Sequence, residues 1–262
     1  MRLPPSQSTQ AALIEKNLQT VFLAMSVAQK QCNGSQYLFS DIPHPIFNCV
    51  VEAKSADGDV QRTILSIWED YQKQNKLHSW WISERSEPQN FAQHLQALGF
   101  QKGPVYSGMH GKLKKMDFVL ERSPSIRIER MSDPEAFDAW MKPMAESFEF
   151  SPAVAAAFGK CYQNLFVTTD QWINYFAFYE DQLAGVSSLF LGKDAAGLYN
   201  GAVFPQFRNK GVLTHLGRTM LADAQSHGTE DVVVQVSGAS HNISLKAGFK
   251  EYLKFQAYLS PS

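Results

Sequence analysis

The segment "AVFPQFRNKGVLTHLGRTMLADA", residues 202–224, runs from a short apolar stretch through a proline and a basic turn into a long amphipathic pattern. Apolar side chains recur on one helical face from Val212 to Ala224, which predicts a helix that Gly228 can end. This helix would follow the turn at residues 208–211 rather than a capping side chain. Its first N–H groups then lack a partner and carry partial positive charge, which suits a bound anion.

The basic turn strengthens the expectation of an anion site. Gly211 permits close approach of the backbone, and Arg208 and Lys210 supply positive charge. The turn is not a Walker loop, because no Gly-Lys-Ser/Thr follows a glycine at the required spacing. It is not a dinucleotide fingerprint either, because Gly211 stands alone. A solvated basic turn is the alternative interpretation, and spacing alone leaves both open.

Composition limits the classes of protein and partner. The chain has 262 residues, 44% of them hydrophobic, which suits one large domain or two modest ones. A net charge of −1 provides no global field for nucleic acid or an acidic membrane surface. Three scattered cysteines predict neither a disulfide framework nor a zinc site, and no apolar run is long enough to span a bilayer. We therefore expect a soluble, cytoplasmic protein without a metal.

The second part of the chain shows a regular alternation of elements. Turn signals separate β-rich runs from helical patterns, with Glu180-Asp181 as a hairpin turn. The order is β, α, α, β, β, β, α, β, α, β. The expected ranges are 126–130, 132–148, 151–166, 172–180, 182–192, 197–204, the helix after Gly211, 231–236, 238–249 and 249–259.

A short sequence pattern in the first part recurs in the second. "HLQALGF" at 94–100 and "ISLKAGF" at 243–249 both place a short helix before Gly-Phe, and each follows an apolar strand. The recurring pattern indicates a duplication, although a short helix joined through glycine to a strand is common enough to arise by chance. A charged, Ser/Pro-containing stretch separates the two parts. We expect a boundary near Arg122, with domains at 1–122 and 123–262.

The segment "GLYNGAVFPQFRNKGVLTHL", with the buried strand and the "SLKAGF" junction after it, resembles the GNAT superfamily of acyl-CoA-dependent N-acyltransferases. In that family a strand, a Pro-x-x-Arg-x-x-Gly-x-Gly/Ala turn and a helix bind the pyrophosphate of coenzyme A. Pro205, Arg208 and Gly211 match in register, whereas Leu213 stands where the family prefers a small residue. The resemblance covers roughly residues 125–262.

The resemblance implies an α/β (α+β) GNAT fold, with a mixed central sheet flanked by helices, and acetyl-CoA as co-substrate. The backbone near Val203 would pair with the pantetheine arm, and the main chain of residues 208–214 would hold the pyrophosphate. The implied cofactor contacts are Val203, Arg208, Asn209, Lys210, Gly211, Val212, Leu213, Thr214 and Ser237.

The first part resembles the degenerate N-terminal half of tandem GNAT proteins, through "HPIFNCVV", the segment 78–100 and "GPVYSGM". It lacks the Arg-x-x-Gly-x-Gly/Ala turn. The resemblance therefore implies a structural role and two GNAT-like halves. Trp80 and Trp81 are expected to be core residues rather than a binding platform.

The implied reaction is attack of an amine on the thioester, with an N–H near Val203 as oxyanion donor. The family often places a tyrosine four residues before the glycine of the Gly-Phe junction, and Ser244 stands there. Water or nearby His241 would then protonate the thiolate. Tyr199 and Asn200 alternate along one strand, so at most one is expected to face the cleft.

Glu146 and Glu149 fall in the connection that commonly forms the acceptor wall in the family, although a solvated loop is the alternative. The candidate catalytic residues are therefore Ser244, His241, Tyr199, Asn200 and Glu146. We expect an acyltransferase that acts on a small amine. A CoA-binding protein without turnover is the alternative, and a homodimer is left open.

Overall fold

The computed structural model describes residues 5–116, 118 and 123–261. Its contacts separate two compact units. Unit 1 combines the described part of Met1–Leu18 with Met109–Tyr252, and unit 2 combines Gln19–Gly108 with the described part of Leu253–Ser262. The boundary expected near Arg122 falls outside the described residues. The division into domains at 1–122 and 123–262 stays a prediction, because compactness does not reveal which segments form each ancestral half.

The elements of the second part follow the expected order, and each expected helix and strand is confirmed. They are β6 (Ile126–Arg130), α4 (Phe137–Ser147), α5 (Pro152–Thr168), β7 (Trp172–Tyr179), β8 (Gln182–Leu191), β9 (Ala196–Val203), α6 (Val212–Ser226), β10 (Asp231–Val236), α7 (Ala239–Lys246) and β11 (Lys250–Leu259). The Glu180-Asp181 turn takes φ angles of 47° and 60°, as a tight hairpin turn of this hand requires.

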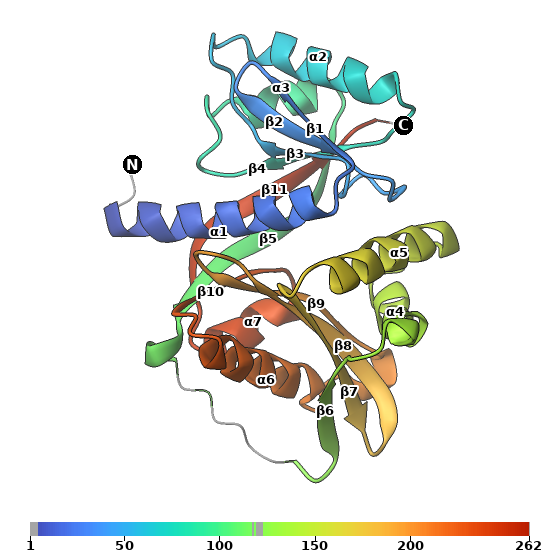
Figure 1. Ribbon diagram of the computed structural model, residues 1–262. Coiled ribbons are helices and arrows are strands. Elements are labelled where there is room, and N and C mark those ends of the chain that lie inside the picture. Colours follow the sequence, from blue (N-terminus) through green and yellow to red (C-terminus); the bar gives the residue numbers. More distant parts are fainter. Residues whose placement is uncertain (1–4, 117, 119–122, 262) are drawn as a thin grey trace. The chain divides into compact units, whose positions relative to one another are not determined.

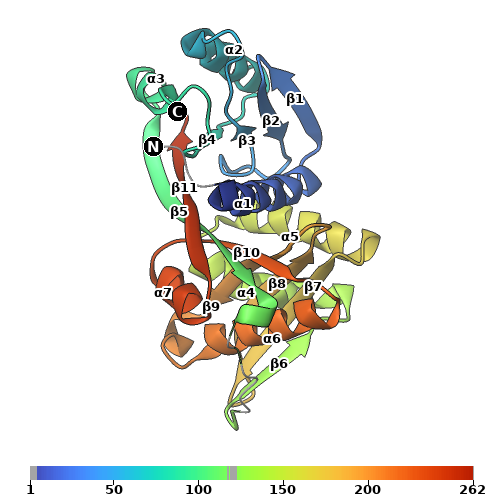
Figure 2. The same cartoon turned by 90° about the vertical axis from the view of Figure 1, so that its left-hand side faces the viewer.

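The sheet of unit 1 has the strand order β5-β10-β9-β8-β7-β6, where β5 is Gln101–Lys112. Strands β6 to β9 are antiparallel, and β10 runs parallel to β9. Helix α6 contacts β6 to β9 on one face, while α4 and α5 contact β7 to β9 on the other (Figures 1 and 2). This layered arrangement brings the end of β9 and the start of α6 together at one edge of the unit.

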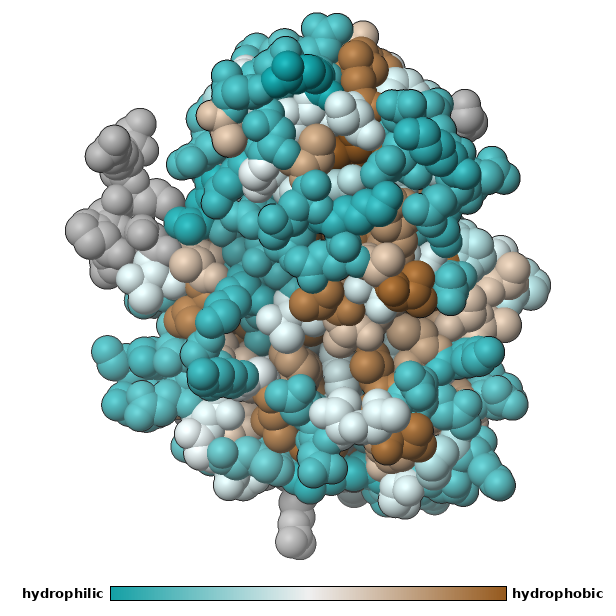
Figure 3. Space-filling view, turned by 45° about the horizontal axis from the view of Figure 1, so that its top comes forward, coloured by the Kyte–Doolittle hydropathy of each residue, from teal (hydrophilic) through white to brown (hydrophobic). Residues whose placement is uncertain are grey.

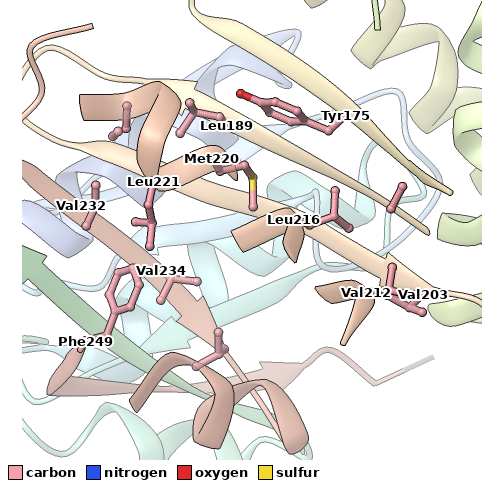
Figure 4. Close-up of a cluster of buried hydrophobic side chains, with 14 of the residues drawn as sticks. Tyr175, Leu189, Val203, Val212, Leu216, Met220, Leu221, Val232, Val234 and Phe249 are labelled. Atoms are coloured by element: carbon pink, nitrogen blue, oxygen red, sulfur yellow. The ribbon is translucent and has the colours of Figure 1, made fainter. Parts of the chain in front are cut away.

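The predicted apolar stripe of α6 lies in the core of unit 1. Val212, Leu216 and Met220 are at most 2% exposed, and they pack among sheet residues such as Leu189 and Val234 (Figure 4). Burying a side chain of this size stabilises a fold by about 1.5–3 kcal/mol. The stripe therefore anchors α6 firmly, and its first turn is held in place by the buried Val212.

Unit 2 is built from its own sheet and helices. Its strand order is β1-β2-β3-β4-β11-β5. The elements are β1 (Ala28–Cys32), β2 (Ser35–Phe39), β3 (Cys49–Glu52), α2 (Val60–Gln72), β4 (Ser79–Ile82) and α3 (Phe91–Ala97). Trp80 and Trp81 are 0% and 6% exposed, so the prediction that they are core residues is confirmed.

The recurring sequence pattern, "HLQALGF" and "ISLKAGF", corresponds to a repeated structure. The order β3-α2-β4-α3-β5 matches β9-α6-β10-α7-β11, and the first two strands of each series are parallel. Both short helices end at a left-handed glycine, Gly99 at φ 86° and Gly248 at φ 95°. After each glycine, Phe100 and Phe249 donate their N–H back to the helix, at 3.0 and 3.1 Å. Two halves of related fold are therefore present.

Helix α1 (Pro5–Ala24) is an element that the sequence analysis did not predict. Its residues up to Leu18 belong to unit 1 and the remainder to unit 2. In the part of the chain that the structure describes, no helix has the length and apolar character needed to cross a membrane. On the face that Figure 3 shows, hydrophobic residues are interspersed among hydrophilic ones.

Candidate functional site

The start of α6 has the geometry that the sequence predicted. Gly211 is the N-cap residue at φ 84° and ψ 0°, and no side chain among the described residues caps the helix. The left-handed conformation favours glycine here, because a Cβ would be strained. The chain enters through a short 3-10 turn at Pro205–Phe207 and a left-handed Asn209, φ 61°. A helix start of this kind can hold an anion through backbone N–H groups.

The two basic residues of the turn behave differently. Arg208 is exposed, and its Nε donates to the carbonyl oxygen of Val203 over 3.3 Å, which ties the turn to the end of β9. Its other guanidinium N–H groups remain for further contacts. Lys210 places its Nζ 4.5 Å from the centre of the Tyr179 ring, a cation–π contact. Both residues belong to the turn that leads into Gly211.

Strands β9 and β10 separate before either one ends. Their parallel pairing joins Ala196 to Val232 and Leu198 to Val234. Within the described residues the pairing stops there, although β9 continues to Val203 and β10 to Val236. The backbone of residues 199–203 is thus released from β10 on that side. An extended ligand can pair with such an edge as an added strand.

A β-bulge lies at the point of separation. Val186 pairs with Ala202, but Ser188 pairs with Tyr199, so β9 carries one extra residue opposite β8. Asn200 adopts the left-handed conformation, φ 58°. This conformation costs most residues roughly 1–2 kcal/mol, and asparagine tolerates it best because its side chain hydrogen-bonds locally. The Asn-Gly pair at 200–201 is a known turn signal, and the sequence analysis missed it inside the strand.

The Leu213 side chain lies next to this bulge. A Cβ placed on Gly201 would lie 2.9 Å from Leu213 Cδ1, so a side chain at residue 201 would displace it. The two positions are therefore complementary: the large residue on α6 is matched by a glycine on β9. Gly201 itself is exposed, which leaves the bulge backbone accessible. Sequence comparison at position 213 alone could not reveal this pairing.

Tyr199 and Asn200 turn toward the same group of side chains. The Tyr199 ring lies 6.1 Å from Trp172, and Trp172 lies 5.1 Å from Tyr162, which hydrogen-bonds Asn200. The expectation that these two residues would alternate faces is wrong, because the left-handed Asn200 breaks the alternation. The Tyr199 hydroxyl donates to Asn17 Oδ1 over 2.6 Å, and burial raises the pKa of Tyr199 well above its usual value.

The candidate residues around α7 differ in their exposure and in their contacts. Ser237 is exposed directly after β10. Ser244 is 9% exposed and stands four residues before Gly248, the position that the family resemblance assigns to tyrosine. His241 is half-buried, and its Nε2 lies 3.1 Å from the carboxylate of Glu251 on β11. The imidazole therefore has a carboxylate as its hydrogen-bond partner.

The connection between α4 and α5 reaches β9. Ser147 Oγ donates to the carbonyl oxygen of Val203 over 3.2 Å, so the end of α4 borders the same backbone as Arg208. Glu146 and Glu149 flank this serine and are exposed. Ser147, the neighbour of Glu146, and Arg208 of the basic turn therefore donate to the same carbonyl oxygen. Ser147 was missed by the sequence analysis, which had no signal for it.

Only the comparison of structures finds proteins similar to this chain. No family model matches the sequence, and no curated protein matches it. Among solved structures, a GCN5-related N-acetyltransferase from Kribbella flavida superimposes with a TM-score of 0.75 at 10% identity, over 96% of both chains. A GCN5-related N-acetyltransferase from Sphaerobacter thermophilus gives 0.62 at 14% identity, over 78% of this chain and 69% of the other.

A tandem arrangement also has a structural counterpart. A tandem GNAT protein from the clavulanic acid biosynthesis pathway gives a TM-score of 0.60 at 16% identity, over 87% of this chain and 79% of the other. Together with the repeated β-α-β-α-β series, these likenesses confirm the expected GNAT fold with two related halves. At these identities the comparisons concern the fold alone.

Proposed function

We propose that this protein, which has the GNAT fold, transfers an acyl group from acetyl-CoA to the amine of a small acceptor. One observation carries the proposal: the uncapped start of α6 follows the end of β9, the segment over which β9 has separated from β10. A phosphate-binding helix start and an open strand edge at one place fit the two ends of an extended CoA arm.

The cofactor contacts follow from this arrangement. The pyrophosphate would accept hydrogen bonds from the main chain of residues 209–214 and from Arg208, and Lys210 would add positive charge. Pantetheine would pair with β9 near Val203, and Ser237 at the end of β10 would border it. The absence of a side chain at Gly201 leaves room for the larger residue at position 213.

The chemistry requires a neutral amine, an oxyanion donor and a proton for the thiolate. A backbone N–H near Val203 would serve as the donor. Ser244 is too short to replace a tyrosine at the sulfur, so water or His241 would supply the proton. Glu146, on the Ser147 side of Val203, is the carboxylate that would face the incoming amine.

The second candidate function is a CoA-binding protein without turnover. Ser244 in the tyrosine position and the engaged state of the Tyr199 hydroxyl favour it. The two candidates share the cofactor site and differ only in reaction.

Binding and reaction are therefore measured separately. Calorimetry with acetyl-CoA tests the site, and thiol release over a panel of amines tests turnover. Arg208→Glu should weaken acetyl-CoA binding at least tenfold, on the order of 1.4 kcal/mol, because repulsion replaces a charge-assisted contact. Lys102→Glu, the same charge change at an exposed site in unit 2, should leave binding unchanged.

The outcomes separate the alternatives. Unchanged affinity in a folded Arg208→Glu variant would refute the placement of the pyrophosphate. Tight binding by the wild-type protein, with no thiol released by any amine or by water, would favour the protein without turnover.

A further inference from the structure

The bulge of β9 is held from one side by a buried asparagine. Asn17, 5% exposed, accepts the Tyr199 hydroxyl at 2.6 Å and donates from Nδ2 to the carbonyl oxygen of Ala195 at 2.8 Å. Asn17 thus bridges Ala195, directly before β9, and Tyr199, directly before the bulge. Glycine at position 197 leaves it room, because a Cβ there would collide with Asn17 Oδ1.

The same bulge is also held by a row of buried polar groups. Asn200 Nδ2 donates to Ser188 Oγ over 3.1 Å, and Ser188 donates to Asn174 Oδ1 over 2.6 Å. Ser188 and Asn174 are both 0% exposed, and Tyr162 hydrogen-bonds Asn200 as well. The left-handed Asn200 is therefore fixed through its own amide.

These arrangements depart from what stability alone favours. A left-handed residue in mid-strand carries a conformational cost, and the Asn174 Nδ2 atom is buried without a partner among the described residues. Both features lie in one row that ends at the bulge. Local rules are broken most often where a fold serves a function.

We infer that Tyr199 and Asn200 are positioning residues, which Asn17 and Ser188 hold so that the β9 backbone beyond the bulge is aligned to polarise the thioester carbonyl. The inference rests on the proposed function. It assigns neither side chain to proton transfer, because the polar atoms of both are already engaged with buried partners. A donor held in advance stabilises an oxyanion without reorganising during the reaction.

The test uses acetyl-CoA that is isotope-labelled at its acetyl carbonyl carbon, so that no acceptor is required. Polarisation of the carbonyl by the β9 backbone should move its NMR signal away from the free-solution position. Asn200→Gly retains the left-handed backbone and loses the amide. We expect it to bind acetyl-CoA within about threefold of the wild type, with the carbonyl signal returned toward the free position.

Two further variants separate positioning from general stability. Asn75→Gly also replaces a left-handed asparagine, φ 51°, but at an exposed site in unit 2, and it should leave the carbonyl signal unchanged. Ser188→Ala breaks the link to Asn200 from its other end. The double variant Ser188→Ala/Asn200→Gly should shift the signal by less than the sum of the two single changes, because both changes break the shared link between Ser188 and Asn200.

The results discriminate clearly. A wild-type carbonyl signal in Asn200→Gly, or additive shifts in the double variant, overturns the inference while acetyl-CoA binding still supports the proposed function. If the wild-type protein binds no acetyl-CoA, both fail. Once an acceptor is identified, Asn200→Gly should lower kcat about tenfold or more at nearly unchanged KM for acetyl-CoA.

Discussion

The two parallel βαβ segments begin their helices in opposite ways. Helix α2 starts at Asp59, whose carboxylate accepts the N–H of Arg62 at 3.0 Å. Asp57 lies beside it and pairs with the Arg62 guanidinium, and the amide of Asn33 with the N–H of Asp59 lowers the pKa of Asp57 to about 2. Helix α6 starts at Gly211, with no such side chain among the described residues.

The difference teaches how one supersecondary unit can have or lack an anion site. At α2 the positive helix end is already satisfied by the chain's own carboxylates. At α6 no side chain among the described residues satisfies the same end, and this is where we propose that the pyrophosphate binds. Acidic residues at the helix start therefore make α2 a poor place for an anion, although the β3-α2-β4 fold is retained.

The largest expected effect comes from giving α6 the start of α2. Gly211→Asp places a carboxylate at the proposed pyrophosphate site, and we expect acetyl-CoA affinity to fall about 100-fold, or about 2.7 kcal/mol. Space allows the side chain, since the nearest atom to a Cβ there is His215 Nδ1 at 3.6 Å.

Gly211→Asn is the matched control for this change. Asparagine has the same shape, tolerates the left-handed backbone equally well and carries no charge. Calorimetry should show a much smaller loss for asparagine than for aspartate. Equal losses would mean that the backbone, and not charge, explains the effect, and the comparison of the two helix starts would fail.

A second contrast between the units concerns buried histidines. His78 in unit 2 is fully buried, stacks on Tyr71 at 4.2 Å, and has no hydrogen-bond partner for either ring nitrogen among the described residues. Burial lowers the pKa of His78 from 6.5 to about 3. His110 in unit 1 is also buried, but its Nε2 lies 2.6 Å from the Asp231 carboxylate.

Acid should therefore weaken unit 2 through His78. Because the folded pKa is lowered, the unfolded chain binds a proton between pH 6.5 and about 3 that folded His78 does not accept. This loss of stability approaches about 1.4 kcal/mol per pH unit. In urea unfolding between pH 7 and 5, His78→Phe should lose less stability than the wild type on acidification. Identical losses would contradict this role.

Removing the cap of α2 should have a smaller effect. Asp59→Ala deletes the hydrogen bond to the Arg62 N–H, and we expect a loss of about 1 kcal/mol in the free energy of unfolding. Asp59→Asn, which can still accept that bond, should lose less. Chemical denaturation measures both. An unchanged free energy of unfolding in Asp59→Ala would show that the Asp59 carboxylate does not satisfy the N–H groups at the start of α2.

The smallest expected effect is on stoichiometry, which should not change. Titration of the wild-type protein should give one acetyl-CoA per chain, because the β3–α2 segment has no basic glycine turn. Asp59→Ala should also bind one, since removing one carboxylate leaves Asp57 in place. Two equivalent sites in the wild type would show that the first half retains a cofactor site.

The sequence predicted the fold well where short-range signals act. The stripe from Val212 to Ala224 and the Glu180-Asp181 turn depend on neighbours in the chain, and the structure confirms both. The glycine start of α6 followed from the absence of a capping residue. Each of these features is written within a window of about one element.

Features that depend on distant partners could not be predicted. The pairing of Leu213 with Gly201 joins a helix to a strand, and the contact of Asn17 with Tyr199 joins residues 182 positions apart. Which polar side chains come into contact depends on the fold, and these long-range contacts cannot be predicted from a single sequence. The bulge at Asn200 is an intermediate case, because its Asn-Gly signal was present and outweighed by the β-rich residues around it.

The membership of residues 253–259 of β11 in unit 2 bears on how the protein is made. Residues 253–262 belong to the same compact unit as residues 19–108, and Tyr258 pairs with Trp80 on β4. During synthesis the ribosome therefore releases most of unit 2 long before the strand that completes its sheet. Until then the edge of β4 is open to incorrect strand partners. We therefore expect fragments that end before residue 253 to aggregate.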